Sequence, residues 1–155
     1  MTISSLIGAQ SELMSEVTLG AAVSPGTSTL GLGNTRLLHR ALGNLIKNGI
    51  HHARSRVDVT ISQRHGQLQL DVDDDGPGIP MSLRERLFQP FSRLAIERQR
   101  GPAGHGLGLA IVQRIAAQHQ GRITVDESPL GGARFRLSLP SVRAGRDVQH
   151  VVRAG

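Results

Sequence analysis

Residues 35–72 read TRLLHRALGNLIKNGIHHARSRVDVTISQRHGQLQLDV, and their hydrophobic periodicity changes halfway along the segment. In the first half, apolar residues recur at three- and four-residue spacing, which is typical of an amphipathic helix. The predicted buried stripe of this helix comprises Leu38, Leu42, Leu45, Ile46 and Gly49. In the second half, apolar and polar residues alternate on either side of a polar break at His65 and Gly66. This pattern predicts a β-hairpin with strands at 57–63 and 67–72.

Further segments complete the predicted order of elements. The motif MSLRERLF predicts a short helix with Ser82 at its N-cap, and GLGLAIVQRIAAQHQG predicts a helix over 107–120 that Gly121 closes. RITVDES and GARFRLSLP predict a second strand pair. Because strands adjacent in sequence are joined by hairpin-length turns, the predicted fold class is α/β, a two-layer sandwich with a mixed, mainly antiparallel sheet. We expect about three helices to cover one face of this sheet.

The length and composition fit one domain of ordinary size. The chain has 155 residues, no Cys and no run near the roughly 18 apolar residues that span a bilayer. We expect a poorly defined segment at 1–33 with room for one strand, a domain at 34–140 and a flexible polar tail at 141–155. The start lacks the basic region of a signal peptide. These features predict a cytoplasmic location, for the chain itself or for a piece of a larger membrane protein.

The charge balance is basic, with 18 Lys and Arg against 12 Asp and Glu and a formal net charge of +6. Such a balance favours anionic partners, namely nucleotides, nucleic acid or an acidic protein surface, without choosing among them. The chain has no Trp, no Tyr and 3 Phe, so it lacks the interleaved aromatic and basic residues of a base-stacking platform. We therefore expect no nucleic-acid partner.

An acidic turn, DVDDDGPGIP at 71–80, follows the second predicted strand. A solvated turn, a metal site and a nucleotide pocket are all consistent with this composition. EF-hand spacing is absent and no bidentate Glu follows at the twelfth position, which argues against a calcium loop. We expect Asp71, Asp73 and Asp75 to face solvent or to cap the turn.

Two other motifs place polar groups on the predicted helices. Asn44 and Asn48 lie four residues apart and project from one helical face, and their amide oxygens are hard, neutral ligands that suit Mg²⁺. The alternative is the polar flank of an amphipathic helix. Gly104, Gly106 and Gly108 open the last helix, where exposed N–H groups favour phosphate. The glycine motif is not a P-loop, because the Gly-Lys-Ser/Thr ending is missing.

Four segments together resemble the ATP-binding catalytic domain of sensor histidine kinases, which has the Bergerat fold of DNA gyrase B, Hsp90 and MutL. They are RALGNLIKNGIHHA (the N-box), DDDGPGIP (the first glycine box), LFQPFSR (the F-box) and GHGLGLAIVQRIAAQHQG (the second glycine box). A fifth segment, GGARFRLSLP, resembles the strand that ends such domains. The resemblance covers residues 33–140, and it depends on the order and spacing of the boxes.

The resemblance implies ATP and Mg²⁺ as cofactors and assigns roles to these motifs. Asn48 would hold Mg²⁺ beside the triphosphate, Asn44 would support the same region, and Arg93 would reach the phosphates. Asp74 would accept a hydrogen bond from the adenine amino group, because a carboxylate is an acceptor-only group that selects a donor edge. The other implied cofactor contacts are His51, His52, Gly76, Gly78, Ile79, Gly104, His105, Gly106, Leu107 and Gly108.

The N-box departs from the histidine kinase pattern at two positions, and at a third it differs from the ATPase relatives of the fold. His51 stands where Lys or Arg usually meets a phosphate, so a neutral imidazole supplies less charge and nucleotide affinity can depend on pH. Gly49 replaces the usual Ala and should weaken the helix by about 1 kcal/mol. Asn44 stands where the ATPase relatives carry a Glu that activates water, and an amide cannot act as a general base. The resemblance therefore implies phosphoryl transfer rather than hydrolysis.

The implied activity is that of a protein histidine kinase, which transfers the γ-phosphoryl group of ATP to a His on a separate dimerisation domain. A response regulator would receive the group next in a two-component relay. No segment resembles the phosphoacceptor domain, so we expect a monomeric catalytic domain that cannot phosphorylate itself, either cut from a membrane-anchored kinase or occurring as a natural short protein. Two alternatives stay open: a catalytically weak, nucleotide-binding regulatory module, and an anti-sigma-type serine kinase of the same fold.

Overall fold

The computed structural model describes residues 17–24, 35–89 and 108–140. Its strands are β1 (Thr18–Val23), β2 (Arg56–Arg64), β3 (Gln67–Asp74), β4 (Arg122–Glu127) and β5 (Ala133–Pro140). They form one five-stranded sheet in the order β1-β2-β3-β5-β4. β1 runs parallel to β2, and the other neighbouring strands are antiparallel. The predicted mixed, mainly antiparallel sheet is confirmed.

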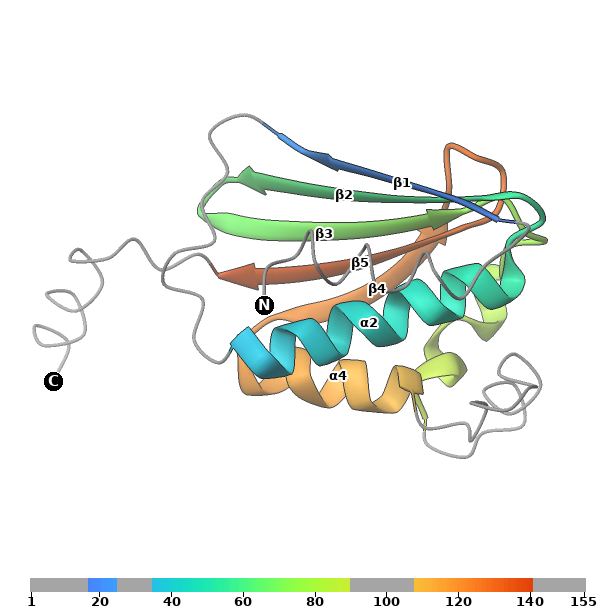
Figure 1. Ribbon diagram of the computed structural model, residues 1–155. Coiled ribbons are helices and arrows are strands. Elements are labelled where there is room, and N and C mark those ends of the chain that lie inside the picture. Colours follow the sequence, from blue (N-terminus) through green and yellow to red (C-terminus); the bar gives the residue numbers. More distant parts are fainter. Residues whose placement is uncertain (1–16, 25–34, 90–107, 141–155) are drawn as a thin grey trace, which may run out of the picture.

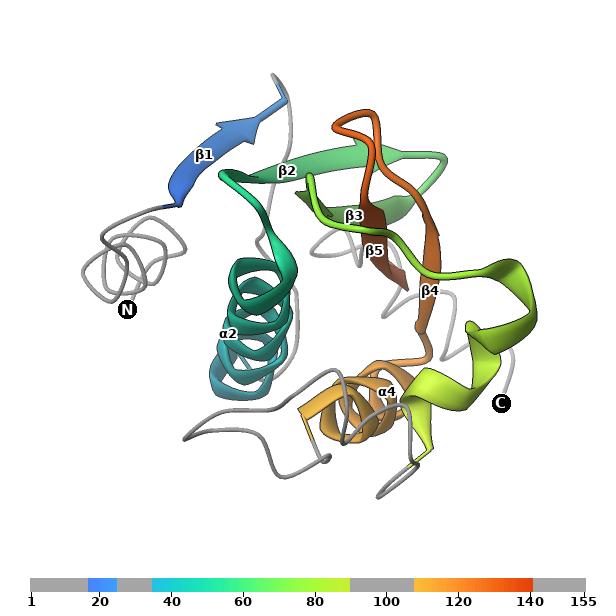
Figure 2. The same cartoon turned by 90° about the vertical axis from the view of Figure 1, so that its right-hand side faces the viewer.

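The helices among the described residues are α2 (Thr35–His52), η1 (Met81–Leu83), η2 (Glu85–Phe88) and α4 (Gly108–Gln118). The α-helices α2 and α4 lie side by side on one face of the sheet (Figure 1). Seen from the side, sheet and helices form two layers (Figure 2). We call the sheet face that α2 and α4 cover the helix face, and the opposite one the open face. This arrangement confirms the predicted two-layer sandwich.

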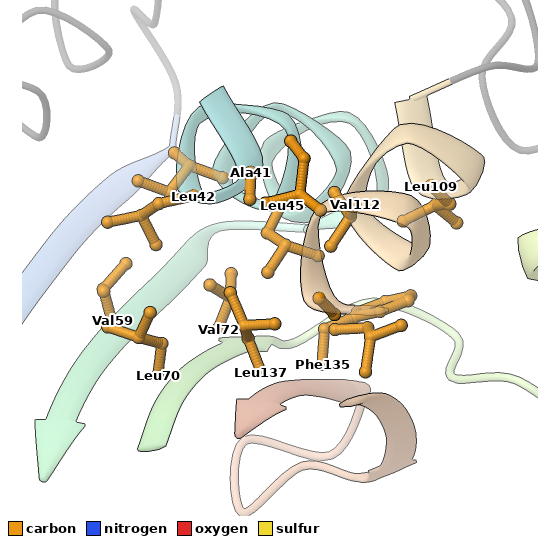
Figure 3. Close-up of a cluster of buried hydrophobic side chains, with 14 of the residues drawn as sticks. Ala41, Leu42, Leu45, Val59, Leu70, Val72, Leu109, Val112, Phe135 and Leu137 are labelled. Atoms are coloured by element: carbon orange, nitrogen blue, oxygen red, sulfur yellow. The ribbon is translucent and has the colours of Figure 1, made fainter. Parts of the chain in front are cut away.

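Helix α2 buries the stripe that its periodicity predicts. The buried members are Leu38, Leu42, Leu45, Ile46 and Gly49. They pack against the helix-face side chains of β3 and β5, including Val72, Phe135 and Leu137, and against Leu109 and Val112 of α4 (Figure 3). The core is therefore mostly aliphatic, with Phe135 contacting Phe88 edge-on at a centroid separation of 6.4 Å. Apolar burial on this face is the main force that holds the two layers together.

The β2–β3 hairpin also forms where the alternation predicts it. Its two turn residues, His65 and Gly66, have φ angles of 51° and 72°. Positive φ at both central residues is what a two-residue hairpin turn needs to match the twist of the strands. The strands extend beyond the predicted limits, so that Asp74 is the last residue of β3.

Two predicted details of the helices are wrong. The MSLRERLF segment forms the two short 3₁₀-helices η1 and η2, and Pro80 rather than Ser82 occupies the N-cap of η1, without a side-chain cap hydrogen bond. Helix α4 ends at Gln118, and Gln120, not Gly121, has the left-handed conformation, with φ 56°. The N–H of Gly121 still donates to the carbonyl of Ala116 at 2.8 Å, which completes the C-terminal end.

Candidate functional site

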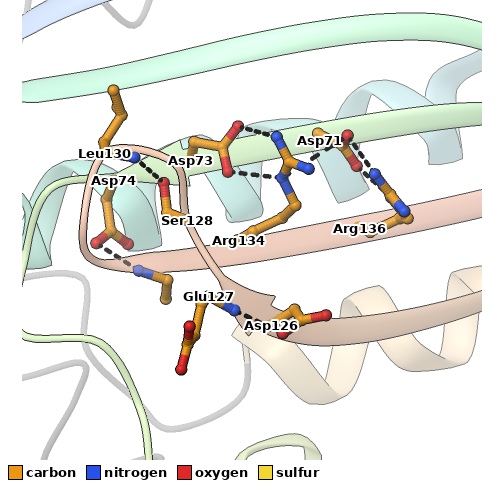
Figure 4. Close-up of polar contacts among 10 residues, drawn as sticks. Asp71, Asp73, Asp74, Asp126, Glu127, Ser128, Leu130, Arg134 and Arg136 are labelled. Atoms are coloured by element: carbon orange, nitrogen blue, oxygen red, sulfur yellow. Dashed lines mark hydrogen bonds and ion pairs between the residues drawn. The ribbon is translucent and has the colours of Figure 1, made fainter.

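The side chain of Asp74 lies on the helix face, where the strand ends. Its residue is only 1% exposed, and it follows Leu70 and Val72 in the alternation of β3. Its Oδ1 accepts hydrogen bonds from the N–H groups of Gly76 at 2.9 Å and of Ala133 at 3.1 Å. Figure 4 shows Asp74 beside the β4–β5 loop. Backbone donors from two segments therefore fix the orientation of this buried carboxylate.

The loop between β4 and β5 approaches Asp74 so closely that only glycine fits. A Cβ at Gly132 would collide with Oδ1 of Asp74. The N–H of Gly132 also donates to the carbonyl of Asp74 at 3.2 Å. Asp74 is thus attached to the β4–β5 side of the sheet.

Asp75, the next residue, is bound to a different segment. Its Oδ1 accepts the N–H groups of Arg54 at 2.7 Å, Ser55 at 3.0 Å and Arg56 at 3.2 Å. Its Oδ2 accepts the Ser55 hydroxyl at 2.7 Å. These hydrogen bonds, that of the Ser55 hydroxyl first, hold the pKa of Asp75 well below its usual range. Asp75 thus holds the connection from α2 to β2, rather than capping the acidic turn in which it lies, as the sequence had suggested.

The turn after β3 packs directly on the C-terminal end of α2. A Cβ at Gly76 would collide with the carbonyl oxygen of His52. Gly78 has a φ of 73°, a left-handed conformation that side chains disfavour. Ile79 is buried and joins the hydrophobic core. Within the first glycine box, Gly76 therefore lies against α2, whereas Gly78 lies near Gly132 of the β4–β5 loop.

Helix α2 carries the predicted metal ligand toward the same region. Asn48 is 3% exposed, and neither its Oδ1 nor its Nδ2 has a hydrogen-bond partner among the described residues. Buried amide groups without a partner are costly, so they point to a ligand that would satisfy them. The neighbouring Gly49 lies against Val72, two residues before Asp74. The structure therefore brings Asn48 and Asp74 to one end of the layer interface.

The other candidate residues of the N-box are more exposed to solvent than Asn48. Asn44 is half-buried one turn before Asn48. His51 is exposed and His52 half-buried, and their rings meet edge-on with centroids 4.8 Å apart. Gly108 is the first residue of α4. Five predicted site residues, Arg93, Gly104, His105, Gly106 and Leu107, lie outside the described residues.

The expectation that Asp71 and Asp73 face solvent or cap the turn is wrong. Both are buried on the open face. Asp73 forms a two-pronged pair with Arg134, at 2.8 and 3.0 Å, and Asp71 forms one with Arg136, at 2.7 and 2.9 Å (Figure 4). The hydrogen bonds to these carboxylates raise the pKa of each Arg above its usual value. The sequence signal was available as two alternating pairs, Asp-x-Asp in one strand and Arg-x-Arg in the other.

A cavity of about 370 Å³ lies beside the turn. Residues 77–80, Arg84 and the β4–β5 loop line it, whereas α2 does not. Arg84 closes one side, because its Nε donates to the carbonyl of Ile79 at 3.1 Å. The cavity shares Gly78 and Ile79 with the predicted site, but neither Asp74 nor Asn48 lines it.

Within the described ranges, no group of three or more His, Asp or Glu side chains could hold a metal ion. Mg²⁺ does not require such a group, because it usually keeps several waters and binds one or two protein ligands plus phosphates. The orphaned amide of Asn48 fits that requirement. Among the helices of the described part, none is long and apolar enough to cross a membrane.

Solved histidine kinase structures share this architecture. Full-length ShkA in complex with AMPPNP matches with a TM-score of 0.76 at 30% identity, over 93% of this chain and 31% of that one. The mycobacterial sensor histidine kinase MprB matches with a TM-score of 0.74 at 29% identity, over 89% of this chain and 91% of that one. The fold is therefore that of a histidine kinase ATP-binding domain.

Residues 33–143 match the family described as "Histidine kinase-, DNA gyrase B-, and HSP90-like ATPase", and the chain belongs to this family. The sensor histidine kinase CpxA of Escherichia coli K12 is 39% identical over 108 residues, which cover 70% of this chain and 24% of CpxA. The sensor protein RstB of the same strain is 45% identical over 105 residues, 68% of this chain and 24% of RstB. The resemblance to sensor histidine kinases is confirmed, and the chain spans 24% of the length of these relatives.

Proposed function

We propose that this chain is the catalytic domain of a protein histidine kinase, which binds Mg-ATP and transfers its γ-phosphoryl group to a His on a separate dimerisation domain. Membership of the family and the similarity to sensor histidine kinases support this proposal. The observation that carries it is the buried Asp74, which lies on the helix face at the end of β3 and is oriented by backbone N–H groups.

The adenine end of the proposed ligand contacts Asp74. The N–H groups of Gly76 and Ala133 both donate to Oδ1, and in this proposal the adenine amino group donates to Oδ2. A carboxylate accepts hydrogen bonds but does not donate them, so it favours the amino group of adenine over the carbonyl that guanine presents there. Ile79 supplies apolar surface beside the base. This contact would make the site selective for adenine.

The phosphate end lies toward α2 in this proposal. Asn48 would supply one oxygen ligand to Mg²⁺, which neutralises phosphate charge when bound. Asn44 supports the same region without acting as a general base, since an amide does not take up a proton at neutral pH. Arg93 and the glycines at 104, 106 and 108 would complete the phosphate contacts, with the backbone N–H groups that precede α4. These residues position the triphosphate for transfer rather than for attack by water.

The proposed reaction requires an acceptor for the phosphoryl group, and this requirement defines the proposed partners. A His-bearing dimerisation domain would receive the phosphoryl group, and a response regulator would take it next. We propose a cytoplasmic location for the domain within a membrane-anchored parent kinase, and a monomeric state for the domain alone. The isolated chain would then bind nucleotide without phosphorylating itself.

The test is a thermal shift of the wild type and of Asp74→Asn with Mg-ADP and Mg-GDP. The wild type should be stabilised by Mg-ADP more than by Mg-GDP. Asp74→Asn replaces one acceptor oxygen by a donor, so Mg-ADP affinity should fall roughly 10- to 100-fold, as expected for a hydrogen bond to a charged group. Equal shifts for the two nucleotides in the wild type would reject Asp74 as the adenine contact.

A second readout separates phosphoryl transfer from nucleotide binding. Labelled ATP is incubated with the chain and an added His-bearing dimerisation domain. Acid-labile label on the added domain supports a histidine kinase, while acid-stable label would indicate a serine kinase instead. Adenine-selective binding without any transfer would favour the regulatory module.

A further inference from the structure

We propose that Asp75 is a positioning residue that fixes the C-terminal end of α2 against the turn that carries Asp74. By doing so it sets the distance between the adenine end and the phosphate end of the site. The inference rests on the proposed function, because it assigns a ligand to these two ends. Asp75 itself does not contact the ligand in this scheme.

The first argument is the number of donors that converge on one carboxylate. Three consecutive backbone N–H groups, from Arg54, Ser55 and Arg56, and the Ser55 hydroxyl all donate to Asp75. They begin two residues after the end of α2 at His52. A loop held only by its own backbone could move with the end of the helix, whereas this loop is tied to the turn. An Asp carboxylate is charged at neutral pH, and the hydrogen bonds from Ser55, Arg54 and Arg56 lower the pKa of Asp75 further.

The second argument is that the side chains of Asp74 and Asp75 bind two different segments of the chain. One segment is the β4–β5 loop with the start of β5, and the other is the connection from α2 to β2. Asp74 is held by Ala133 and packs against Gly132, both from the β4–β5 side. Asp75 is held by the connection from α2 to β2. Gly76, the residue after Asp75, packs against the carbonyl oxygen of His52 and leaves no room there for a side chain. Loss of the Asp75 carboxylate would therefore remove the side-chain attachment of this connection and leave the backbone bond from Asp75 to Arg56, so we expect the end of α2 to loosen while Asp74 keeps its bonds to Gly76 and Ala133.

The consequence for binding depends on which ends of the site a ligand uses. Asn48 lies in the last turns of α2, only four residues before His52. If the end of α2 shifts relative to Asp74, a ligand that spans both ends loses affinity. A ligand that uses only the adenine end keeps its contacts. Adenosine and Mg-ADP are such a pair of ligands.

The experiment measures the dissociation constants of adenosine and Mg-ADP for the full chain by calorimetry or NMR. Asp75→Ala should weaken Mg-ADP about 10-fold, the loss expected when contacts worth about one hydrogen bond are misaligned, and adenosine less than about 2-fold. Asp75→Asn keeps one acceptor oxygen and should lie between Asp75→Ala and the wild type. Asp71→Asn is the matched control, since it removes a buried ion pair on the open face and should lower stability without changing the ratio of the two constants.

Amide hydrogen exchange of Ser55 and Arg56, without ligand, checks the contact directly. Exchange should accelerate in Asp75→Asn relative to the wild type and stay unchanged in Asp71→Asn. Equal losses of adenosine and Mg-ADP affinity in Asp75→Ala, or no loss of either, would overturn the inference while leaving the proposed function intact. A wild type that binds neither ligand would instead overturn the proposed function, and this inference with it.

Discussion

The two faces of the sheet use the same strands in opposite ways. β3 and β5 each send every second side chain to the helix face and the others to the open face. The helix-face residues are Leu70, Val72, Phe135 and Leu137, and the open-face residues are Asp71, Asp73, Arg134 and Arg136. On the helix face, burial of apolar surface holds the layers together. On the open face, two cross-strand ion pairs fill the same register positions with charge.

Asp74 breaks this division and thereby marks the site. By its place in β3 it belongs to the helix face, where the other strand residues are apolar. Its carboxylate accepts backbone N–H groups, in contrast to Asp71 and Asp73, which pair with Arg side chains. A charged group on the apolar face, with no hydrophobic role, is the kind of local inconsistency expected at a functional site.

The largest effect should come from breaking an ion pair on the open face. Asp73→Asn leaves Arg134 facing a neutral amide where the carboxylate is 5% exposed, and its remaining partner is the Asp71 carboxylate, 3.9 Å from Nε. Removing one member of a buried pair costs several kcal/mol, and because Arg134 can still reach water we expect about 2–3 kcal/mol. Urea denaturation measures this loss in the free energy of unfolding. Mg-ADP affinity should not change, since the open face takes no part in the proposed site.

Asp126→Asn is the matched control on the same face. Asp126 is 76% exposed and pairs with Arg84 at 3.5 Å. Exposed pairs contribute little, so its loss should cost less than about 1 kcal/mol. Equal losses in Asp73→Asn and Asp126→Asn would contradict the view that buried ion pairs stabilise the open face.

A smaller effect, dependent on pH, should come from Asp75 at the border of the two faces. Its folded-state pKa is lowered, so its contribution to stability is present above the ordinary Asp pKa of about 4 and is lost as pH falls below that value. The difference in unfolding free energy between the wild type and Asp75→Asn should therefore be constant from about pH 7 to 5 and shrink below about pH 4. Denaturation series at each pH measure it. A difference that grows on acidification would show that the sign is wrong.

Periodicity predicts the helix face well, because it depends on residues close in sequence. The stripe of α2 and the alternation of β2 and β3 are local patterns, and both elements form where expected. The roles of the acidic residues depend on partners far away in the chain. Asp73 meets Arg134 across 61 positions, and Asp75 meets Ser55 across 20. Composition cannot tell a solvated carboxylate from a paired one, so Asp71 and Asp73 were misjudged.

In the candidate site, too, some features follow from local sequence patterns and others depend on distant partners. Spacing on one helix suffices to place Asn44 and Asn48 on a common face, and the glycine box points to Asp74. The positioning role of Asp75 requires the loop after α2 to return beside the turn, which follows from the β2–β3 pairing and not from any short motif. The helix ends were missed for a local reason: Pro80 keeps the φ of −54° that its ring favours, and Gln120 takes the left-handed conformation while Gly121 donates to the carbonyl of Ala116.

The smallest effect is expected on the helix face, at Gly49. Replacing Gly by Ala within a helix gains about 1 kcal/mol in propensity. A Cβ at this position would lie 3.3 Å from Val72 and 3.4 Å from Val57, which is tighter than ordinary contact. The two effects oppose each other, so Gly49→Ala should change the unfolding free energy by less than about 1 kcal/mol.

Making Gly49→Ala in a Val72→Ala variant separates the effect of helix propensity from the effect of crowding at Gly49. Val72→Ala removes the nearest methyl group that the new Cβ would meet and leaves those of Val57, so in that background Gly49→Ala should recover part of its propensity gain of about 1 kcal/mol. If Gly49→Ala has the same effect in both backgrounds, crowding against β3 is not what opposes the gain. If the coupling appears, the helix face is packed too closely to accept one methyl group, whereas the open face tolerates the loss of an exposed charge. The contrast between close apolar packing and paired charge would then be measured on the two faces of one sheet.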